Sequence, residues 1–231
     1  MAAMKAQPIL ALDVPSLDAA RALLDRVGPE ADFVKVGLEL FTAEGPNVVD
    51  WLQKSGRRVF LDLKLHDIPN TVRGAAASAA SMGVALLTVH GYGGASMVEA
   101  AVQGAGESTG ILVVTVLTSH DRLGLGLVLG REVPEIGAEV LRVAAMADAG
   151  GAHGIVCSGH EVRAVRTTFP KLRPLVPGLR LAGGNAHDQA RVTTPERAAA
   201  DGAAYLVLGR AVTAADDPAA VMAAVRNSLG A

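Results

Sequence analysis

The sequence predicts an α/β fold, a single-domain (β/α)8 barrel of the TIM type that spans residues 1–231. Three observations predict this fold. Short apolar runs alternate with longer Ala-rich segments along the whole chain, as in repeated βα units. The runs number eight, and 231 residues is close to the usual size of such a barrel. No linker divides the chain into two smaller domains; an open doubly wound sheet is the alternative, but it normally has fewer repeats.

Each expected strand is a short apolar run that is followed by a segment of high helix propensity. The expected strands are Pro8–Leu12, Asp32–Val36, Arg58–Leu63, Val84–Val89, Ile111–Leu117, Gly154–Cys157, Leu172–Val176 and Tyr205–Leu208. The expected helices are Leu17–Val27, Ala43–Lys54, Thr71–Met82, Ala95–Ala105, Glu135–Ala149, Glu161–Thr168, Pro195–Ala200 and Pro218–Ser228. Ser16 and Thr194 have the pattern of helix N-caps. Thr118–Pro134 is rich in Gly and Leu without clear periodicity, so we expect an extended loop of the kind that often acts as a lid.

Composition and charge exclude several functional classes. Apolar residues make up 50% and charged residues 19% of the chain, which favours a folded core over disorder. The 21 basic and 23 acidic residues give a net charge of −2, which argues against a nucleic-acid partner. The single cysteine, Cys157, cannot form an internal disulfide, and we expect it to be a small buried apolar residue. Neither a membrane-spanning stretch nor a signal-peptide pattern is present, so we expect a cytoplasmic protein without membrane contact.

Polar residues follow most of the expected strands, at the end of the barrel where active sites form. One charged residue at a strand end would mean little, but several converging strands with paired charges indicate a site. These residues are Asp13, Lys35, Asp62, Lys64, His90, Thr118, Ser119, Arg180 and Arg210.

The run from Leu61 to Asn70 carries the most specific signal. Period-two alternation places Asp62 and Lys64 on one face of the strand, toward the barrel mouth, while the intervening leucines face the helices. A structural ion pair at the barrel top is the alternative. Asp67 could equally be the N-cap of the next helix, and Lys35 could be a surface lysine whose stem alone is buried.

A cleft with lysines among carboxylates favours one kind of chemistry. A lysine that forms a Schiff base must lose its proton, and neighbouring carboxylates oppose this loss. Lys64 is therefore better suited to be a general acid, whose ammonium stabilises a developing carbanion and then protonates it. Such a reaction requires neither a metal nor an organic cofactor.

The loops after the seventh and eighth strands indicate a phosphate site. Barrels of this type often hold phosphate there with backbone N–H groups. Gly178, Gly183, Gly184 and Gly209 supply flexible backbone, and Arg180 and Arg210 supply charged donors. The alternative is that these residues only form turns and contact solvent. Dinucleotide, Walker and HExxH motifs are all absent, so we expect no cofactor and no metal.

In the residues described above and in several further motifs, the chain resembles the orotidine 5′-phosphate decarboxylase family in its bacterial form, over nearly its whole length. The run DLKLHDIPNT, from Asp62 to Thr71, is highly specific, and shorter pieces follow in the family's order. These pieces are Ala11-Leu12-Asp13-Val14-Pro15, Val34-Lys35-Val36-Gly37, Val116-Leu117-Thr118-Ser119, Pro177-Gly178-Leu179-Arg180, DQARVTTP from Asp188 to Pro195, and Gly209-Arg210.

The resemblance implies a homodimer that decarboxylates orotidine 5′-monophosphate to UMP without a cofactor, in the last step of UMP biosynthesis. It implies that Lys35, Asp62 and Lys64 of one subunit form a charge network with Asp67 of the other, and that Lys64 protonates the pyrimidine carbon. Thr71 would also reach the partner's site. The residues that the resemblance assigns to substrate binding are Asp13, Lys35, Ile68, Thr71, Thr118, Ser119, Pro177, Arg180, Gln189, Gly209 and Arg210.

Two other functions stay open at this point. A magnesium-dependent sugar-phosphate enzyme on the same barrel shares the Asp-x-Lys-x-x-Asp pattern, and sensitivity to EDTA would separate it. A barrel that binds a phosphorylated nucleotide without turnover is the second, but the complete Lys35, Asp62, Lys64 and Asp67 set argues against it.

Overall fold

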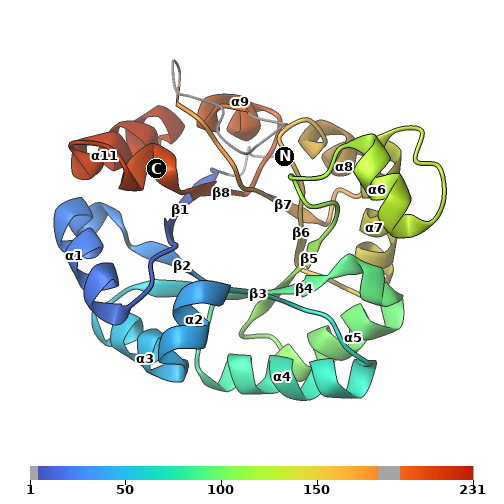
Figure 1. The fold of residues 1–231 in the computed structure, drawn as a ribbon, viewed down its shortest axis with the longest axis horizontal. Helices are drawn as coiled ribbons and strands as arrows, with labels where there is room; N and C mark the ends of the chain where they lie inside the picture. The colour runs from blue at the N-terminus through green and yellow to red at the C-terminus, as the bar shows by residue number, and fades with distance from the viewer. Residues whose placement is uncertain (1–4, 182–192, 231) are drawn as a thin grey trace.

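The computed structural model describes residues 5–181 and 193–230, and its centre is a closed barrel of parallel strands (Figure 1). The strands pair in sequence order and the eighth pairs with the first, which confirms the predicted fold class. They are β1 (Gln7–Leu12), β2 (Phe33–Gly37), β3 (Arg58–Leu65), β4 (Leu86–His90), β5 (Gly110–Val114), β6 (Gly154–Val156), β7 (Arg173–Val176) and β8 (Tyr205–Leu208).

Helices form an outer ring around these strands (Figure 1). Ser16 and Thr194 are helix N-caps as predicted, since their side chains accept hydrogen bonds from the backbone N–H of Ala19 and Arg197. The helices are α1 (Leu17–Val27), α2 (Leu38–Glu44), α3 (Pro46–Lys54), α4 (Pro69–Ser81), α5 (Gly94–Ala105), α6 (Arg122–Leu129), α7 (Ile136–Ala149), α8 (Val162–Thr168), α9 (Pro195–Ala200), α10 (Arg210–Thr213) and α11 (Pro218–Leu229), with short 3-10 turns at Gly28–Glu30 and Gly91–Gly93.

Several segments differ from the prediction, among them the short helix α10, which was not expected. The helix expected over Ala43–Lys54 is two helices, because the chain turns at Gly45, whose φ is 61°, and restarts at Pro46. The expected loop Thr118–Pro134 contains the helix α6, whose N-cap Asp121 accepts a hydrogen bond from Gly124 N. Leu125 of α6 is buried and Leu129 packs partly against the core, whereas Leu123 and Leu127 are 75% and 86% exposed, so apolar residues lie on both the inner and the outer side of the helix.

The apolar core has two layers that follow from the period-two alternation of the strands. Phe60 packs inside the barrel, whereas its neighbour Leu61 packs between the strands and the helices. The interior layer closes the barrel beneath its mouth; it is formed by Ile9, Ala11, Phe33, Phe60, Leu86, Leu112, Leu175, Ala204, Tyr205 and Val207. In the described ranges, no helix is both long and apolar enough to cross a membrane.

Candidate active site

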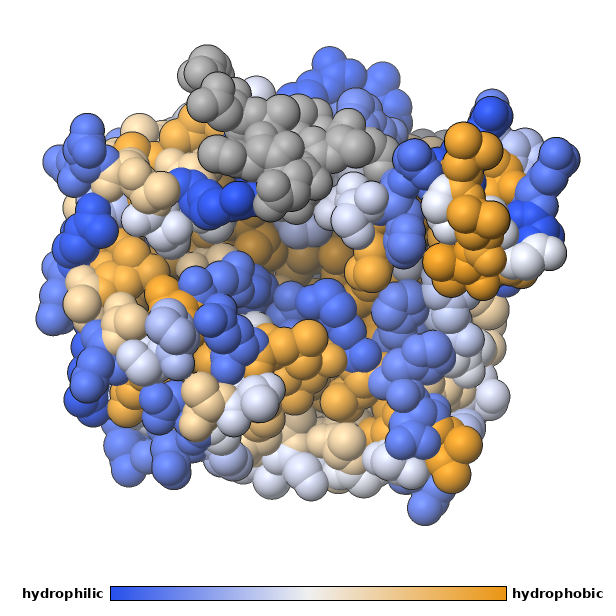
Figure 2. Space-filling view, viewed as in Figure 1, coloured by the Kyte–Doolittle hydropathy of each residue, from blue (hydrophilic) through white to orange (hydrophobic). Residues whose placement is uncertain are grey.

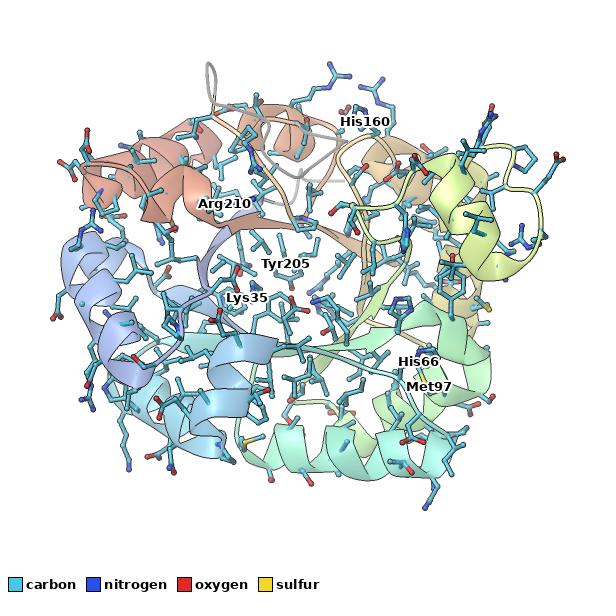
Figure 3. The ribbon with its side chains drawn as sticks, in the orientation of Figure 1. Lys35, His66, Met97, His160, Tyr205 and Arg210 are labelled. Carbon is cyan, nitrogen blue, oxygen red and sulfur yellow. The ribbon has the colours of Figure 1, made fainter. Side chains whose placement is uncertain are left out.

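Two lysines and two aspartates meet at the carboxyl ends of β1, β2 and β3. Lys35 Nζ lies 2.6 Å from Asp13 Oδ1 and 3.9 Å from Asp62 Oδ2, and Lys64 Nζ lies 2.8 Å from that same Asp62 oxygen. The side chains of Lys35 and Asp62 are only 9% and 15% exposed. This is a partly buried row of alternating charges, in which each ammonium is paired with a carboxylate. In Figure 3, Lys35 lies within the ring of strands.

The end of β3 is irregular where it presents these charges. Pairing with β4 is regular up to Leu61 and resumes only at Leu65, and Lys64 in between has a φ of 50°. A non-glycine residue in the left-handed region is strained and is often found at functional sites. Both Asp62 and Lys64 line the cavity at the mouth, as the alternation predicts, although the strand does not keep regular pairing to its end.

One part of the cavity beside the network is apolar. This slot has a volume of about 160 Å³, and the buried Cys157 is among its walls, in agreement with the expected burial of that cysteine. Besides the charged residues, its lining is formed by Phe60, Val114, Val116, Leu117, Thr118, Val156, Cys157, Leu175, Pro177 and Val207. A narrow apolar slot next to paired charges suits a flat ring that carries one charged group.

The other part of the cavity is polar and opens toward the ends of β7 and β8. Its walls add the loop from Gly178 to Arg180, together with Asp13, Gly37, Gly209 and Arg210. Figure 2 shows hydrophilic side chains gathered at the centre of this face beside hydrophobic ones, and Figure 3 places Arg210 at the rim. Two guanidinium groups near flexible backbone can bind a phosphate group. Within residues 5–181 and 193–230, no cluster of three or more His, Cys, Asp or Glu side chains is arranged to hold a metal ion.

Several residues that the resemblance assigns to the site do not reach this cavity. Asp67, Ile68 and Thr71 are exposed at the start of α4 and do not line it. Asp67 is not the N-cap of α4: Ile68 holds that position, and Asp67 Oδ1 accepts a hydrogen bond from Ile68 N, because Pro69 shifts the helix start by one residue. Ser119 is also exposed, next to the lining residue Thr118. Gln189, Gly183 and Gly184 lie outside the described residues.

Two residues that sequence reasoning did not assign to the site support the network from close by. Thr88 of β4 is buried and contacts both Asp62 and Lys64. Gly37 lies so close that a Cβ atom there would be 3.0 Å from Lys35 Nζ and 3.1 Å from Asp13 Oδ1. No local sequence pattern signals either role, because both depend on contacts between different strands.

Gly37→Ala is expected to lower kcat/KM about 10-fold, because the added methyl group displaces the Lys35–Asp13 pair by a few tenths of an ångström. Gly74→Ala on α4, where a Cβ meets nothing within 4 Å, is the matched control. Steady-state kinetics of both variants on the substrate proposed below test this. Equal kinetics for the two variants would show that the pair tolerates the shift.

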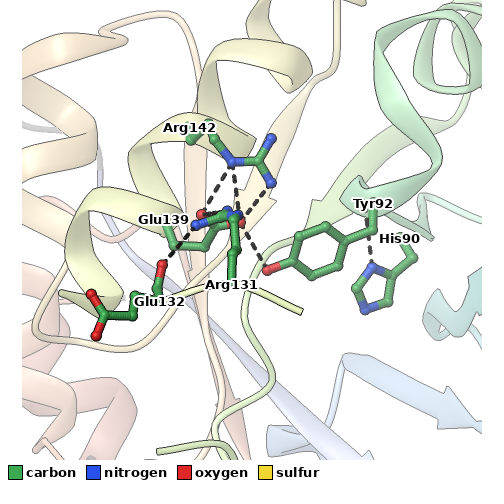
Figure 4. Close-up of polar contacts among 6 residues, drawn as sticks. All are labelled: His90, Tyr92, Arg131, Glu132, Glu139 and Arg142. Atoms are coloured by element: carbon green, nitrogen blue, oxygen red, sulfur yellow. Dashed lines mark hydrogen bonds and ion pairs between the residues drawn. The ribbon is translucent and has the colours of Figure 1, made fainter. Parts of the chain in front are cut away.

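A second polar cluster ties the α6 segment to the body of the barrel (Figure 4). Glu139 of α7 has a side chain that is only 3% exposed, and it lies 2.5 Å from both Arg131 and Arg142, while Tyr92 OH donates a 3.2 Å hydrogen bond to it. The hydrogen bond from Arg142, reinforced by Arg131, lowers the pKa of Glu139 to about 2. Burial, reinforced by Glu139, raises the pKa of Tyr92 to about 12.

The same cluster extends toward the site through stacked rings. Tyr92 stacks on His90 and His90 on His66, with ring centroids 5.4 Å and 5.5 Å apart. Burial lowers the pKa of His90, and the positive charge of Lys64 acts in the same direction. His66 thus contributes an exposed ring to this stack, directly before the exposed Asp67.

Glu139→Gln is expected to lower the free energy of unfolding at pH 7 by about 1–3 kcal/mol, because the charge-assisted hydrogen bonds from two guanidinium groups lose their ionic partner. Since the folded-state pKa of about 2 lies below the usual 4.5, this stabilisation is complete above pH 4.5 and is lost as the pH falls toward 2. Urea unfolding at pH 7 and pH 3 should therefore show a smaller difference between variant and wild type at the lower pH. The control is Glu99→Gln, which alters an exposed carboxylate on α5. If Glu139→Gln and the wild type differed in free energy of unfolding by as much at pH 3 as at pH 7, the ionised Glu139 carboxylate would not be the source of this stabilisation.

Comparisons with known proteins agree with this geometry. The family model described as "Orotidine 5′-phosphate decarboxylase / HUMPS family" matches residues 6–225. A protein of Anaeromyxobacter sp. (strain K) named orotidine 5′-phosphate decarboxylase is 54% identical over 220 residues, which cover 95% of this chain and 96% of the relative. A protein of the same name from Cutibacterium acnes is 46% identical over 229 residues, which cover 97% of each chain. The crystal structure of orotidine 5′-phosphate decarboxylase from Lactobacillus acidophilus superimposes with a TM-score of 0.87 at 35% identity, covering 98% of this chain and 100% of that one.

Proposed function

The chain belongs to the orotidine 5′-phosphate decarboxylase / HUMPS family, and we infer that it is a carboxy-lyase that converts orotidine 5′-monophosphate to uridine 5′-monophosphate and CO2 in pyrimidine biosynthesis. One observation carries this inference. The Lys35–Asp62–Lys64 network lies between an apolar slot and a rim that bears two arginines. The three parts match the ring, the reacting carboxylate and the phosphate of this nucleotide.

The proposed binding mode follows these three parts. The pyrimidine ring occupies the apolar slot, with Thr118 and Pro177 in its lining and Ser119 next to Thr118 in the chain. Asp13 and Lys35 hold the ribose hydroxyl groups, since both residues line the polar part of the cavity and their charged groups pair there. Gly209, Arg180, Arg210 and Gln189 bind the phosphate group, with the two guanidinium groups as charged donors.

In the proposed reaction, the bond between the ring carbon and its carboxylate breaks, CO2 leaves, and the electron pair stays on the ring carbon. Lys64 Nζ, held 2.8 Å from Asp62, stabilises this negative charge and then transfers its proton to the carbon. The proton that Lys64 loses is replaced from solvent. Asp62 lies beside the departing carboxylate, so it favours release of that charged group as neutral CO2. Binding energy from the remote phosphate can be used to hold the ring in this environment.

We propose that the active unit is a homodimer in which Asp67, Ile68 and Thr71 of each subunit complete the neighbouring site. This proposal is supported by their exposure at the barrel mouth, outside their own cavity, with Ile68 66% exposed. The single buried cysteine and the small phosphorylated substrate support a cytoplasmic location.

The assay that tests this function follows the ultraviolet absorbance of orotidine 5′-monophosphate with the purified protein and excess EDTA. We expect loss of substrate absorbance and formation of UMP, and much slower loss with the phosphate-free nucleoside. Activity that EDTA abolishes, or turnover of a keto-sugar phosphate instead, would assign the chain to the metal-dependent side of the family. The apolar slot argues against that outcome, because a polyhydroxylated chain would leave its hydroxyl groups unpaired there.

A further inference from the structure

Thr88 lies in the middle of β4, at the point where β3 departs from regular pairing. Its side chain is completely buried, and its hydroxyl group has two partners, both on β3. Buried hydroxyl groups are normally paired, but here both partners belong to the proposed catalytic strand. The hydroxyl accepts a hydrogen bond from Lys64 N at 2.9 Å and donates one to Asp62 Oδ1 at 2.9 Å.

The bond to Lys64 N replaces a missing ladder bond. Between Leu61 and Leu65 the β3–β4 pairing shifts, and Lys64 takes a φ of 50° that an L-residue rarely adopts. The amide of Lys64 finds its acceptor in the Thr88 side chain. Because the direction of the Lys64 side chain is set by this strained backbone, the hydroxyl of Thr88 helps to aim the ammonium group.

The bond to Asp62 fixes the second member of the network. Thr88 holds Oδ1, which leaves Oδ2 to face Lys64 Nζ at 2.8 Å and Lys35 Nζ at 3.9 Å. Without the hydroxyl donor, the Asp62 carboxylate could rotate and offer either oxygen to the lysines. The Thr88 hydroxyl therefore fixes both the backbone conformation of Lys64, the proposed proton donor, and the orientation of the Asp62 carboxylate that pairs with it.

We propose that Thr88 is a positioning residue for decarboxylation, acting through Lys64 and Asp62 without touching the substrate. The positioning role rests on the proposed function, and it means that a residue of β4 affects the rate of decarboxylation. Thr88 Oγ1 does not line the cavity, so its loss should change kcat far more than the affinity for substrate or product.

The test compares Thr88→Val, which removes the hydroxyl at nearly constant volume, with Thr88→Ser, which keeps it. We expect Thr88→Val to lower kcat about 10- to 100-fold with KM and the Kd for UMP changed less than about threefold. Thr88→Ser should retain kcat within about threefold. The matched control is Thr109→Val at the opposite end of the barrel, where a buried hydroxyl that donates to Val84 O is lost and kcat should be unchanged.

Three results would overturn the positioning role of Thr88. The first is a Thr88→Val enzyme with wild-type kcat, and the second is a Thr88→Ser enzyme as slow as Thr88→Val. The third is a loss of kcat in Thr109→Val equal to that in Thr88→Val. If Thr88→Val does not fold, Thr88→Ala takes its place, and the rescue by Thr88→Ser is judged against it. A wild-type protein that does not decarboxylate the nucleotide would instead refute the proposed function, which the same assay shows first.

Discussion

Replacing Lys64 with alanine is expected to lower kcat by at least about 10⁴-fold while the barrel stays folded. In the proposed mechanism, the change removes both the positive charge that faces the developing carbanion and the proton that the carbon receives, and among the described residues no other ammonium lies as close to Asp62 Oδ2. Alanine, like lysine, carries a Cβ atom, so the positive φ of 50° costs the variant no more than it costs the wild type.

The control for this prediction is Lys54→Ala, which removes an exposed lysine that pairs with Asp50 on α3, away from the cavity. Its kcat should equal that of the wild type, and circular dichroism should show the same secondary structure for both variants. Retention of more than about a tenth of wild-type kcat by Lys64→Ala would remove Lys64 as the proton donor.

Replacing Asp67 with alanine is expected to lower kcat by about 10²-fold or more, although this residue does not line the cavity of its own chain. Within the described chain, its side chain accepts only the local bond from Ile68 N, so the variant should lose little stability. A large loss of activity without a loss of stability would be hard to explain by folding.

Steady-state kinetics and thermal unfolding of Asp67→Ala check this expectation against Asp18→Ala, which alters an aspartate on α1 whose side chain is 90% exposed. Asp18→Ala should behave as the wild type in both measurements. An Asp67→Ala enzyme with normal kcat would show that the carboxylate has no part in the reaction and would weaken the proposed shared site.

The fold could be predicted from the sequence because a barrel of this kind repeats one local pattern. Each short apolar run is buried on both faces, so it stands out from the helices without any knowledge of tertiary contacts. The errors lie at strand ends and in loops. The expected strand Ile111–Leu117 ends at Val114 in β5, because the apolar residues Val116 and Leu117 continue past the last paired residue and line the cavity instead.

The charged residues of the candidate site could also be predicted from the sequence, since Lys35, Asp62 and Lys64 all lie at strand ends that converge in a barrel. Thr88 and Gly37 were not, because their roles depend on the register between neighbouring strands and on a 3 Å approach that no local pattern reveals. The helix α6 was not predicted because its two glycines and two exposed leucines obscure the helical periodicity of its sequence.

The most direct test of the complete account mixes two inactive variants, Lys64→Ala and Asp67→Ala, under conditions that let subunits exchange. In the mixed dimer, one site lacks both residues, while the other combines Lys64 of one subunit with Asp67 of the other. Random exchange should therefore restore about a quarter of the wild-type rate of orotidine 5′-monophosphate decarboxylation, since half of the dimers are mixed and each has one complete site. A mixture that stays as inactive as its parents, with exchange shown independently, would contradict a site built across two subunits.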